Sequence, residues 1–240
     1  LGQNLYMDSS AWGFALQYQG FGFYILEPNS GKYINVDLQD NLVLSDTPRE
    51  FIIVSADGVF KERMEELAEA TVNNPIDATF LLKDPNFNRN DQRVEAWEWS
   101  PMGDAESNPS FWNNHNFSGG NGVNNCAESY HAAFTVRQTV SGAPVGFYEM
   151  TAQGFYRQDD DVEEAAPQFF ANGVNADVPA KTGSEDSMSS ASVSFTTGSY
   201  TIKPISFEVT DDGMLYVGVY TEATHQWVIW DNFQLKYYGS

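Results

Sequence analysis

Hydrophobic and polar positions alternate with a period of two over many short stretches of this chain, a pattern typical of half-buried β-strands. Turn residues separate the stretches: Pro28, Asn29 and Gly31 lie between two of them and supply backbone conformations that tight turns need. Residues 1–58 are therefore expected to form a small β segment. Its predicted strands are at 12–18, 22–26, 32–36, 42–44 and 50–54.

A helical period replaces this alternation once. Phe60, Met64 and Leu67 recur at helical spacing with charged residues on the remaining faces, and Pro75 follows the stretch after two asparagines. The pattern predicts a helix over residues 59–70, inside a connecting segment that extends from residue 59 to residue 75. We expect this helix to have a structural role.

Strand patterns return after the helix and continue to residue 238. Repeated short strands without helical patterns among them are typical of a sandwich or a jelly roll. Residues 76–240 are therefore expected to form an all-β jelly-roll β-sandwich, and two long polar loops, 101–125 and 171–191, are where its binding residues would lie. The predicted strands are at 78–82, 96–99, 132–140, 146–156, 192–195, 205–209, 215–219 and 227–238.

Composition narrows the range of partners. The 240 residues are 42% hydrophobic and 15% aromatic, which argues against a disordered chain. The net charge of −21 argues against binding to nucleic acid or to an anionic membrane surface, and it suits neutral sugars or cations better. No apolar run reaches the length of a membrane span, and the single cysteine, Cys126, excludes an internal disulfide.

Aromatic side chains are the first candidates for ligand binding, because a flat indole or phenol ring stacks on the apolar face of a sugar ring. Trp112 is preferred, since it lies in the first long loop, where no strand pattern buries it. On the last strand, Trp230 is predicted to point away from the apolar face, and Trp227 is a further candidate. Tyr156 and Arg157 face opposite sides of an earlier strand. Arg157 either binds the ligand or pairs with the acidic run that follows it.

One carboxylate falls among apolar neighbours. Read with a period of two, Asp231 shares the face of the last strand that carries Ile229, Phe233 and Leu235. A buried charge is strongly unfavourable unless a cation or several N–H donors compensate it. Asp231 is therefore predicted either to share a structural Ca²⁺ ion with Asp77, which begins the first strand of the sandwich, or to accept backbone hydrogen bonds without a metal.

Signatures of common enzymes are absent. The sequence has no Gly-x-Ser-x-Gly elbow, no His-Glu-x-x-His and no phosphate-binding loop. Enzyme alternatives stay open because 33 acidic residues include many possible catalytic pairs. One is a glycoside hydrolase, and another is a polysaccharide lyase that uses Tyr156, Arg157, Gln138 or His131 on a concave sheet. A structural or adhesive surface module, with its aromatic residues in the core, is a further alternative.

Three stretches of the second segment resemble a known family. Residues 77–97, residues 146–157 and the closing residues 227–235 are similar to the galactose-binding-like jelly-roll carbohydrate-binding modules of secreted glycan-degrading systems in gut bacteria. The resemblance implies a non-catalytic domain that binds glycans through loops at one end or through a concave face, often with a structural Ca²⁺ ion. Asp231 matches the closing Asp that helps to hold that ion, whereas Asp77 is placed only by its position.

The first segment resembles a different family. Residues 23–36 are similar to one repeat of a ricin-type trefoil lectin, so residues 1–58 are expected to be a trefoil-like fragment.

The sequence therefore predicts non-catalytic glycan binding by a secreted, periplasmic or surface-attached bacterial protein. Because the chain opens with Leu1, without an initiator methionine or a signal peptide, we expect a processed or trimmed form. The expected partners are a polysaccharide or oligosaccharide and the other domains of a larger glycan-degrading protein.

Overall fold

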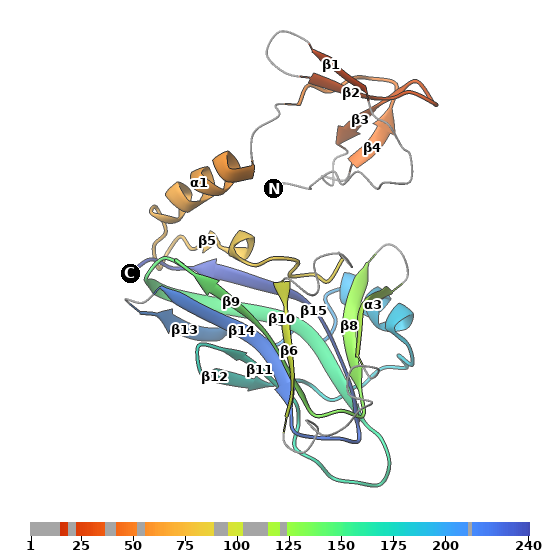
Figure 1. Ribbon diagram of the computed structural model, residues 1–240, viewed down its shortest axis with the longest axis vertical. Helices are drawn as coiled ribbons and strands as arrows, with labels where there is room; N and C mark the ends of the chain where they lie inside the picture. The colour runs from red at the N-terminus through yellow and green to blue at the C-terminus, as the bar shows by residue number, and fades with distance from the viewer. Residues whose placement is uncertain are drawn as a thin grey trace. The chain divides into compact units, whose positions relative to one another are not determined.

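The protein consists mainly of antiparallel strands, which confirms the predicted all-β sandwich class. The chain divides into two compact units, residues 1–62 and residues 63–240 (Figure 1). None of the described helices is long and apolar enough to cross a membrane. The computed structural model describes residues 15–18, 23–36, 42–51, 56–88, 96–102, 115–120, 124–210 and 213–240.

The first unit contains a four-stranded antiparallel sheet whose strands follow one another in chain order. Its predicted turn is present: the carboxylate of Glu27 accepts hydrogen bonds from the backbone N–H groups of Asn29 and Ser30, and Gly31 has a φ of +70°. The trefoil resemblance of this segment stays a prediction. The strands are β1 (Ala15–Tyr18), β2 (Phe23–Glu27), β3 (Lys32–Val36) and β4 (Leu42–Ser45), and helix α1 (Ala56–Leu67) follows across the division between the units.

The second unit contains two antiparallel sheets and one further α-helix, among the residues that the structure describes. Its first elements are β5 (Ile76–Asp77), the 3₁₀-helix η1 (Thr79–Leu81), β6 (Glu98–Pro101), β7 (His115–Gly120), β8 (Asn125–Tyr130) and β9 (Phe134–Ser141). They are followed by β10 (Gly146–Gln158), β11 (Gln168–Ala171), β12 (Val174–Asp177), α3 (Met188–Thr196), β13 (Ile205–Val209), β14 (Met214–Thr221) and β15 (Gln226–Tyr237).

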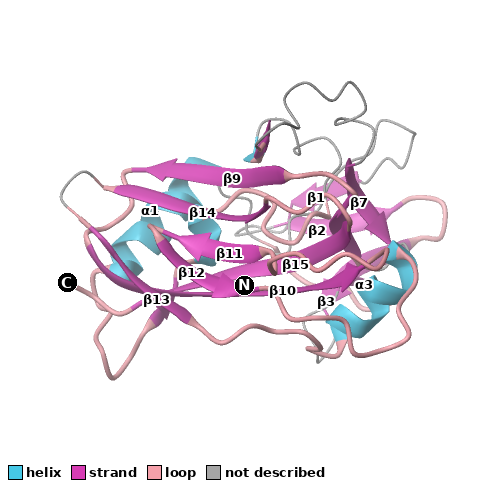
Figure 2. Cartoon of the chain, turned by 90° about the horizontal axis from the view of Figure 1, so that it is seen from below, coloured by secondary structure: helices cyan, strands magenta, loops and turns pink. Residues whose placement is uncertain are grey.

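The two sheets pack face to face as the layers of a sandwich. One has the order β13-β10-β15-β8-β7, with β5 also paired to β15, and the other has the order β12-β11-β14-β9-β6. Apolar side chains from both sheets form the main core, among them Trp230 and Phe233 from the first and Phe134 and Phe169 from the second. Figure 2 shows the two layers edge on.

Helix α3 covers the opposite face of the sheet that contains β15 (Figure 2). Met188 and Phe195 of the helix belong to a second, smaller apolar cluster with Cys126 of β8, Phe155 of β10 and Ile229 of β15. This sheet is therefore buried on both faces over part of its length, because one face meets the other sheet and the other face meets the helix.

A β-bulge interrupts the central strand β15 at Asn232. Between the paired residues Gln153–Asp231 and Thr151–Gln234, β15 advances by one residue more than β10 does. Asn232 takes the left-handed backbone conformation, with a φ of +51°, and asparagine tolerates this conformation better than most residues do. Its side-chain amide donates a hydrogen bond to Gln153 Oε1 at 2.5 Å, which holds the bulge against the neighbouring strand.

The bulge corrects the predicted faces of β15. A strict period of two would place Asp231, Ile229, Phe233 and Leu235 on one face, with Trp230 pointing away from them. The extra residue instead moves Phe233 and Leu235 to the main core, where Trp230 also lies, and leaves Ile229 on the face that α3 covers. The predicted orientation of Trp230 is therefore wrong, and its side chain is 0% exposed.

Two other predicted segments differ in type. Residues 192–195, predicted as a strand, belong to α3, which begins with a capping box in which Ser187 and Ser190 bond each other's backbone N–H groups. Residues 79–81 form a 3₁₀ turn instead of a strand. Five strands, β5, β7, β8, β11 and β12, lie largely in segments predicted as loops or left without a prediction.

Replacing Asn232 by valine should destabilise the fold more than replacing it by glycine. Both variants lose the hydrogen bond to Gln153, but only valine also meets the steric cost of a left-handed conformation, about 1–2 kcal/mol. We expect the free energy of unfolding, measured by urea denaturation, to be lower for Asn232→Val than for Asn232→Gly by about this amount. Equal stability of the two variants would contradict the bulge.

Candidate functional site

Three side chains form a row across the sheet, on the face that α3 partly covers. Arg157 of β10 is paired with Trp227 of β15, and Trp227 is paired with Tyr130 of β8. Directly paired residues of an antiparallel sheet point to the same side, and Trp227 belongs to the apolar cluster on the α3 side. The row therefore lies beside the helix, at one end of the covered face.

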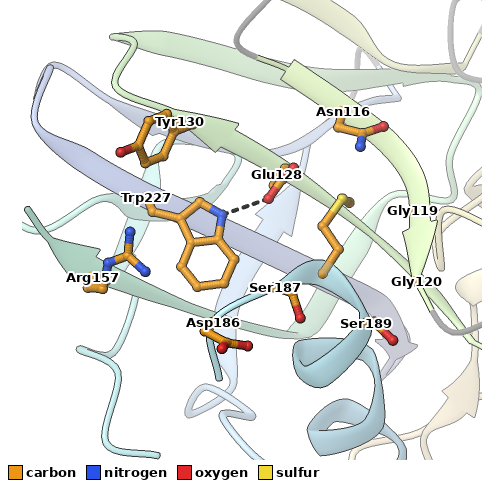
Figure 3. A pocket seen from close by; sticks show the side chains of 11 residues that line it. Asn116, Gly119, Gly120, Glu128, Tyr130, Arg157, Asp186, Ser187, Ser189 and Trp227 are labelled. Atoms are coloured by element: carbon orange, nitrogen blue, oxygen red, sulfur yellow. Dashed lines mark hydrogen bonds between the residues drawn. The ribbon is translucent and has the colours of Figure 1, made fainter. Parts of the chain in front are cut away.

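A pocket of about 740 Å³ opens between this row and the start of α3 (Figure 3). The end of the Met188 side chain lies directly over Gly119 of β7, where a Cβ atom would be 2.4 Å from Met188 Sδ. The pocket is lined by Asn116, Gly119, Gly120, Glu128, Tyr130, Arg157, Asp186, Ser187, Met188, Ser189 and Trp227.

Trp227 forms the floor of the pocket and is nearly fully committed to protein contacts. Its indole Nε1 donates a hydrogen bond to Glu128 Oε2 at 2.7 Å, and the Cζ atom of Arg157 lies 4.9 Å from the ring centroid. Only 4% of the residue is exposed. Trp227 therefore lines the pocket as an anchored surface with little open ring face, and its predicted contact with a ligand stays a prediction.

Arg157 is held by the acidic run that follows its strand. Its Nε and Nη2 atoms donate hydrogen bonds to the two carboxylate oxygens of Asp159, at 2.5 Å and 2.8 Å. The hydrogen bond from Arg157 and a further one from His131 lower the pKa of Asp159 below its usual value, against the opposing effect of burial. Arg157 therefore pairs with the acidic run, as one of the two predicted alternatives has it, and it also lines the pocket, while its contact with a ligand stays a prediction.

Tyr130 offers the exposed aromatic ring of the pocket, and sequence reasoning missed it. It is 47% exposed, and one side of its ring stacks on His131 with centroids 4.0 Å apart and an angle of 13° between the rings. The left-handed φ of His131, +52°, places the two consecutive rings together, where strand geometry would send them to opposite faces. The alternation along β8 could have indicated Tyr130 from the sequence, because Cys126, Glu128 and Tyr130 share one face of the strand.

The start of α3 supplies the opposite, polar wall of the pocket (Figure 3). Ser187 caps the helix, and Asp186 accepts a hydrogen bond from Ser190 Oγ. A carboxylate at a helix N-terminus is favoured by the helix dipole. These contacts order the chain before the helix, so the hydroxyl of Ser189 and the carboxylate of Asp186 are presented to the pocket from a fixed turn.

The remaining predicted aromatic residues lie elsewhere. Trp230 is buried in the main core, where its ring stacks on Phe134 with centroids 5.2 Å apart. Tyr156 is half-buried and packs against the main core, because it points to the opposite face from Arg157. Trp112 lies outside the described residues. The structure therefore brings together Trp227 and Arg157 and separates them from Trp230 and Tyr156.

Asp231 is fully buried beneath α3. Asn124 Nδ2 donates hydrogen bonds to Asp231 Oδ2 at 3.0 Å and to the carbonyl of Ser192 at 3.3 Å, and the backbone N–H of Asn232 donates to Asp231 Oδ1 at 2.7 Å. Burial raises the pKa of Asp231 to about 8, and the nearby charge of Asp84 adds to this increase. Asp231 thus accepts a backbone hydrogen bond, as one of the two predicted alternatives has it.

Asp77 does not lie beside Asp231. It pairs with Lys236 of β15, roughly 15 Å along the strand from Asp231. Its carboxylate is 52% exposed and lies 3.6 Å from Arg63. In the part of the chain that the structure describes, no three His, Cys, Asp or Glu side chains gather as a possible metal site.

Comparisons with known proteins give a match among solved structures alone. No protein-family model matches the chain, and no curated protein sequence matches it. Among solved structures, TmCBM61 in complex with β-1,4-galactotriose aligns with 65% of this chain and 96% of its own chain, at 16% sequence identity and a TM-score of 0.35. A likeness of this degree says nothing of what this chain binds, so the functional conclusion depends on the pocket.

Replacing Asp231 by asparagine should stabilise the metal-free protein increasingly as the pH rises from about 4 to about 8. An unfolded Asp ionises near pH 4, whereas the pKa of the folded Asp231 is about 8. Within this window the unfolded state releases its proton first, so the wild type loses stability as the pH rises, and asparagine cannot ionise. Thermal unfolding in EDTA measures the effect. A difference in Tm that stays constant across the window would contradict a buried, protonated carboxyl.

Proposed function

We propose that this protein binds a carbohydrate, without catalysis, in the pocket beside α3. The observation that carries the proposal is the exposed ring of Tyr130 at the edge of a pocket whose other walls are polar and anchored. Sugar rings have an apolar face that stacks on an aromatic ring and hydroxyl groups that need hydrogen-bond partners. The pocket offers both kinds of contact within one space.

Each wall of the pocket would make a different contact with a sugar. One side of the Tyr130 ring is occupied by His131, which leaves the other side for a pyranose ring. The carboxylates of Glu128 and Asp186 accept hydrogen bonds from hydroxyl groups, and the amide of Asn116 both donates and accepts. Because the hydrogen bond from Trp227 already orients Glu128, part of the site is ordered before the ligand arrives.

The location and the parent protein are proposals as well. We propose that the chain acts outside the cell, secreted or attached to the surface, beside domains that degrade glycans. The resemblance of residues 77–97, 146–157 and 227–235 to modules of secreted systems supports this.

Replacing Tyr130 by alanine should weaken glycan binding about tenfold, because a stacked aromatic ring is the kind of residue that dominates such interfaces. A glycan array identifies the ligands of the wild type, and isothermal titration calorimetry with one of them measures the change. Phe147→Ala is the matched control, since Phe147 is 53% exposed on β10 and does not line the pocket. A loss of affinity in both variants, or in neither, would contradict the proposed site.

Glycoside hydrolysis is a second candidate, because Glu128 and Asp186 line the same pocket from opposite walls. Hydrolysis needs two carboxylates on either side of the scissile bond. Incubating the protein with its array ligands and measuring released reducing ends separates the two functions. Release that disappears in Glu128→Gln, which keeps the acceptor for Trp227, would replace the binding proposal by a hydrolase. Binding without release is the result we expect.

We also propose that Asp231 contributes to a structural Ca²⁺ site. A buried carboxylate needs either a proton or a cation, and the charge of Asp84 lies near enough to raise the pKa of Asp231. Calcium takes six to eight oxygen ligands, so carbonyls, amides and water would supply the rest. The exposed position of Asp77 and its separation from Asp231 argue against Asp77 as a ligand.

Calcium should raise the melting temperature of the wild type at neutral pH and leave that of Asp231→Asn unchanged, because a ligand that binds only the folded state stabilises it by mass action. Differential scanning fluorimetry with EDTA and with added CaCl₂ measures the response. Asp77→Asn serves as the control and should keep the response of the wild type. No response in the wild type would overturn the calcium proposal, and loss of the response in Asp77→Asn would restore Asp77 as a ligand.

A further inference from the structure

Arg157 is the one cation among the described residues that line the pocket. Acidic glycans carry carboxylate or sulfate groups, which proteins recognise through the planar donor fork of arginine. Binding of such a group at this pocket therefore requires N–H groups of Arg157 that are not already paired within the protein.

The fork is already occupied by Asp159. Two of its N–H groups, on Nε and Nη2, are bound to the carboxylate oxygens of Asp159 in a bidentate pair. The guanidinium plane also lies over the ring of Trp227, with Cζ 4.9 Å from the centroid. The charge of Arg157 is therefore compensated within the protein, and the Nε and Nη2 edge of its donor fork is taken by Asp159.

Asp159 is itself held in place from two sides. Its Oδ2 atom lies 3.1 Å from His131 Nε2, and its backbone N–H donates a hydrogen bond to the carbonyl of His225 at 2.8 Å. Its carboxylate is only 17% exposed. A ligand carboxylate at the Nε and Nη2 edge of Arg157 would have to displace this partner and leave Asp159 half-buried without its cation, which is costly. A ligand carboxylate at Nη1 would meet a guanidinium whose charge Asp159 already compensates.

The other charges of the pocket repel an anion. Glu128 and Asp186 line it, and Asp159 is paired with the guanidinium of Arg157, so three carboxylates in and beside the pocket face one cation. Carboxylates accept hydrogen bonds from sugar hydroxyls, but a uronate group would add a fourth negative charge to this space. The arrangement therefore favours hydroxyl-rich, uncharged ligands.

We infer that the pocket selects uncharged glycans over glycans that contain uronic acids, and that Asp159 sets this selection by occupying the guanidinium of Arg157. The inference rests on the proposed carbohydrate binding. It makes Asp159 a specificity-determining residue although it does not itself line the pocket.

The test compares oligosaccharides that differ only in the oxidation of C6: galactose with galacturonate oligomers, glucose with glucuronate oligomers, and mannose with mannuronate oligomers. The wild type should bind the neutral member of at least one pair and should not bind its acidic partner. Asp159→Asn frees the charge of Arg157, and its affinity for the acidic partner should rise about tenfold, the effect of one charge-assisted hydrogen bond.

Asp161→Asn is the matched control, because it makes the same change of charge in the same acidic run at an exposed position that is not part of the pair with Arg157. It should leave both affinities unchanged. Asp186→Asn is a second variant, for use if Asp159→Asn does not fold. Asp186 lies exposed at the pocket, and its replacement should also raise the affinity for the acidic partner.

The outcomes separate this inference from the proposed function. Equal binding of neutral and acidic partners by the wild type would overturn the charge selection and leave carbohydrate binding intact. A gain in Asp159→Asn no larger than in Asp161→Asn would overturn the role of Asp159. Failure of the wild type to bind any of the six oligomers or any glycan on the array would contradict the proposed function itself.

Discussion

The extra residue at Asn232 is the constraint on which the rest of the second unit depends. β15 lies between β10 and β8 and supplies side chains to both faces of their sheet. Without the bulge, Phe233 and the apolar residues after it would leave the main core, since a shift of one residue exchanges the two faces of a strand. With it, one half of β15 packs Trp230 into the sandwich and turns Trp227 toward α3, while the other half still fills the core.

The double burial of this sheet explains where the pocket lies. A sandwich sheet usually meets water on its outer face, but here α3 covers part of that face with its own apolar cluster. The pocket lies where this cover ends, next to the row of Arg157, Trp227 and Tyr130. The same cover encloses Asp231, so the carboxyl next to the bulge is removed from water and burial raises its pKa.

An arginine and an exposed tyrosine ring lie at the pocket of a strongly acidic protein. The protein carries a net charge of −21, yet its pocket contains an arginine, and that arginine is paired internally with Asp159. His131 connects the two halves of the arrangement, since it stacks on Tyr130 and also contacts Asp159. The exposed aromatic ring and the guanidinium over Trp227 are therefore positioned by one small network, which gives the site a fixed shape.

The sequence by itself determined the all-β class, the turn at Gly31 and strands such as β13, because a period of two and turn residues are local properties. Trp227 and Arg157, candidates for ligand binding from the sequence, lie on strongly patterned strands and line the pocket, and their contact with a ligand stays a prediction. Only the tertiary structure decided the orientation of Trp230 and the role of Tyr130. The orientation of Trp230 depends on a bulge that the neighbouring strand β10 stabilises. The role of Tyr130 depends on the pairing of β8 with β15, two strands far apart in the chain. Neither long-range contact leaves a local pattern in the sequence.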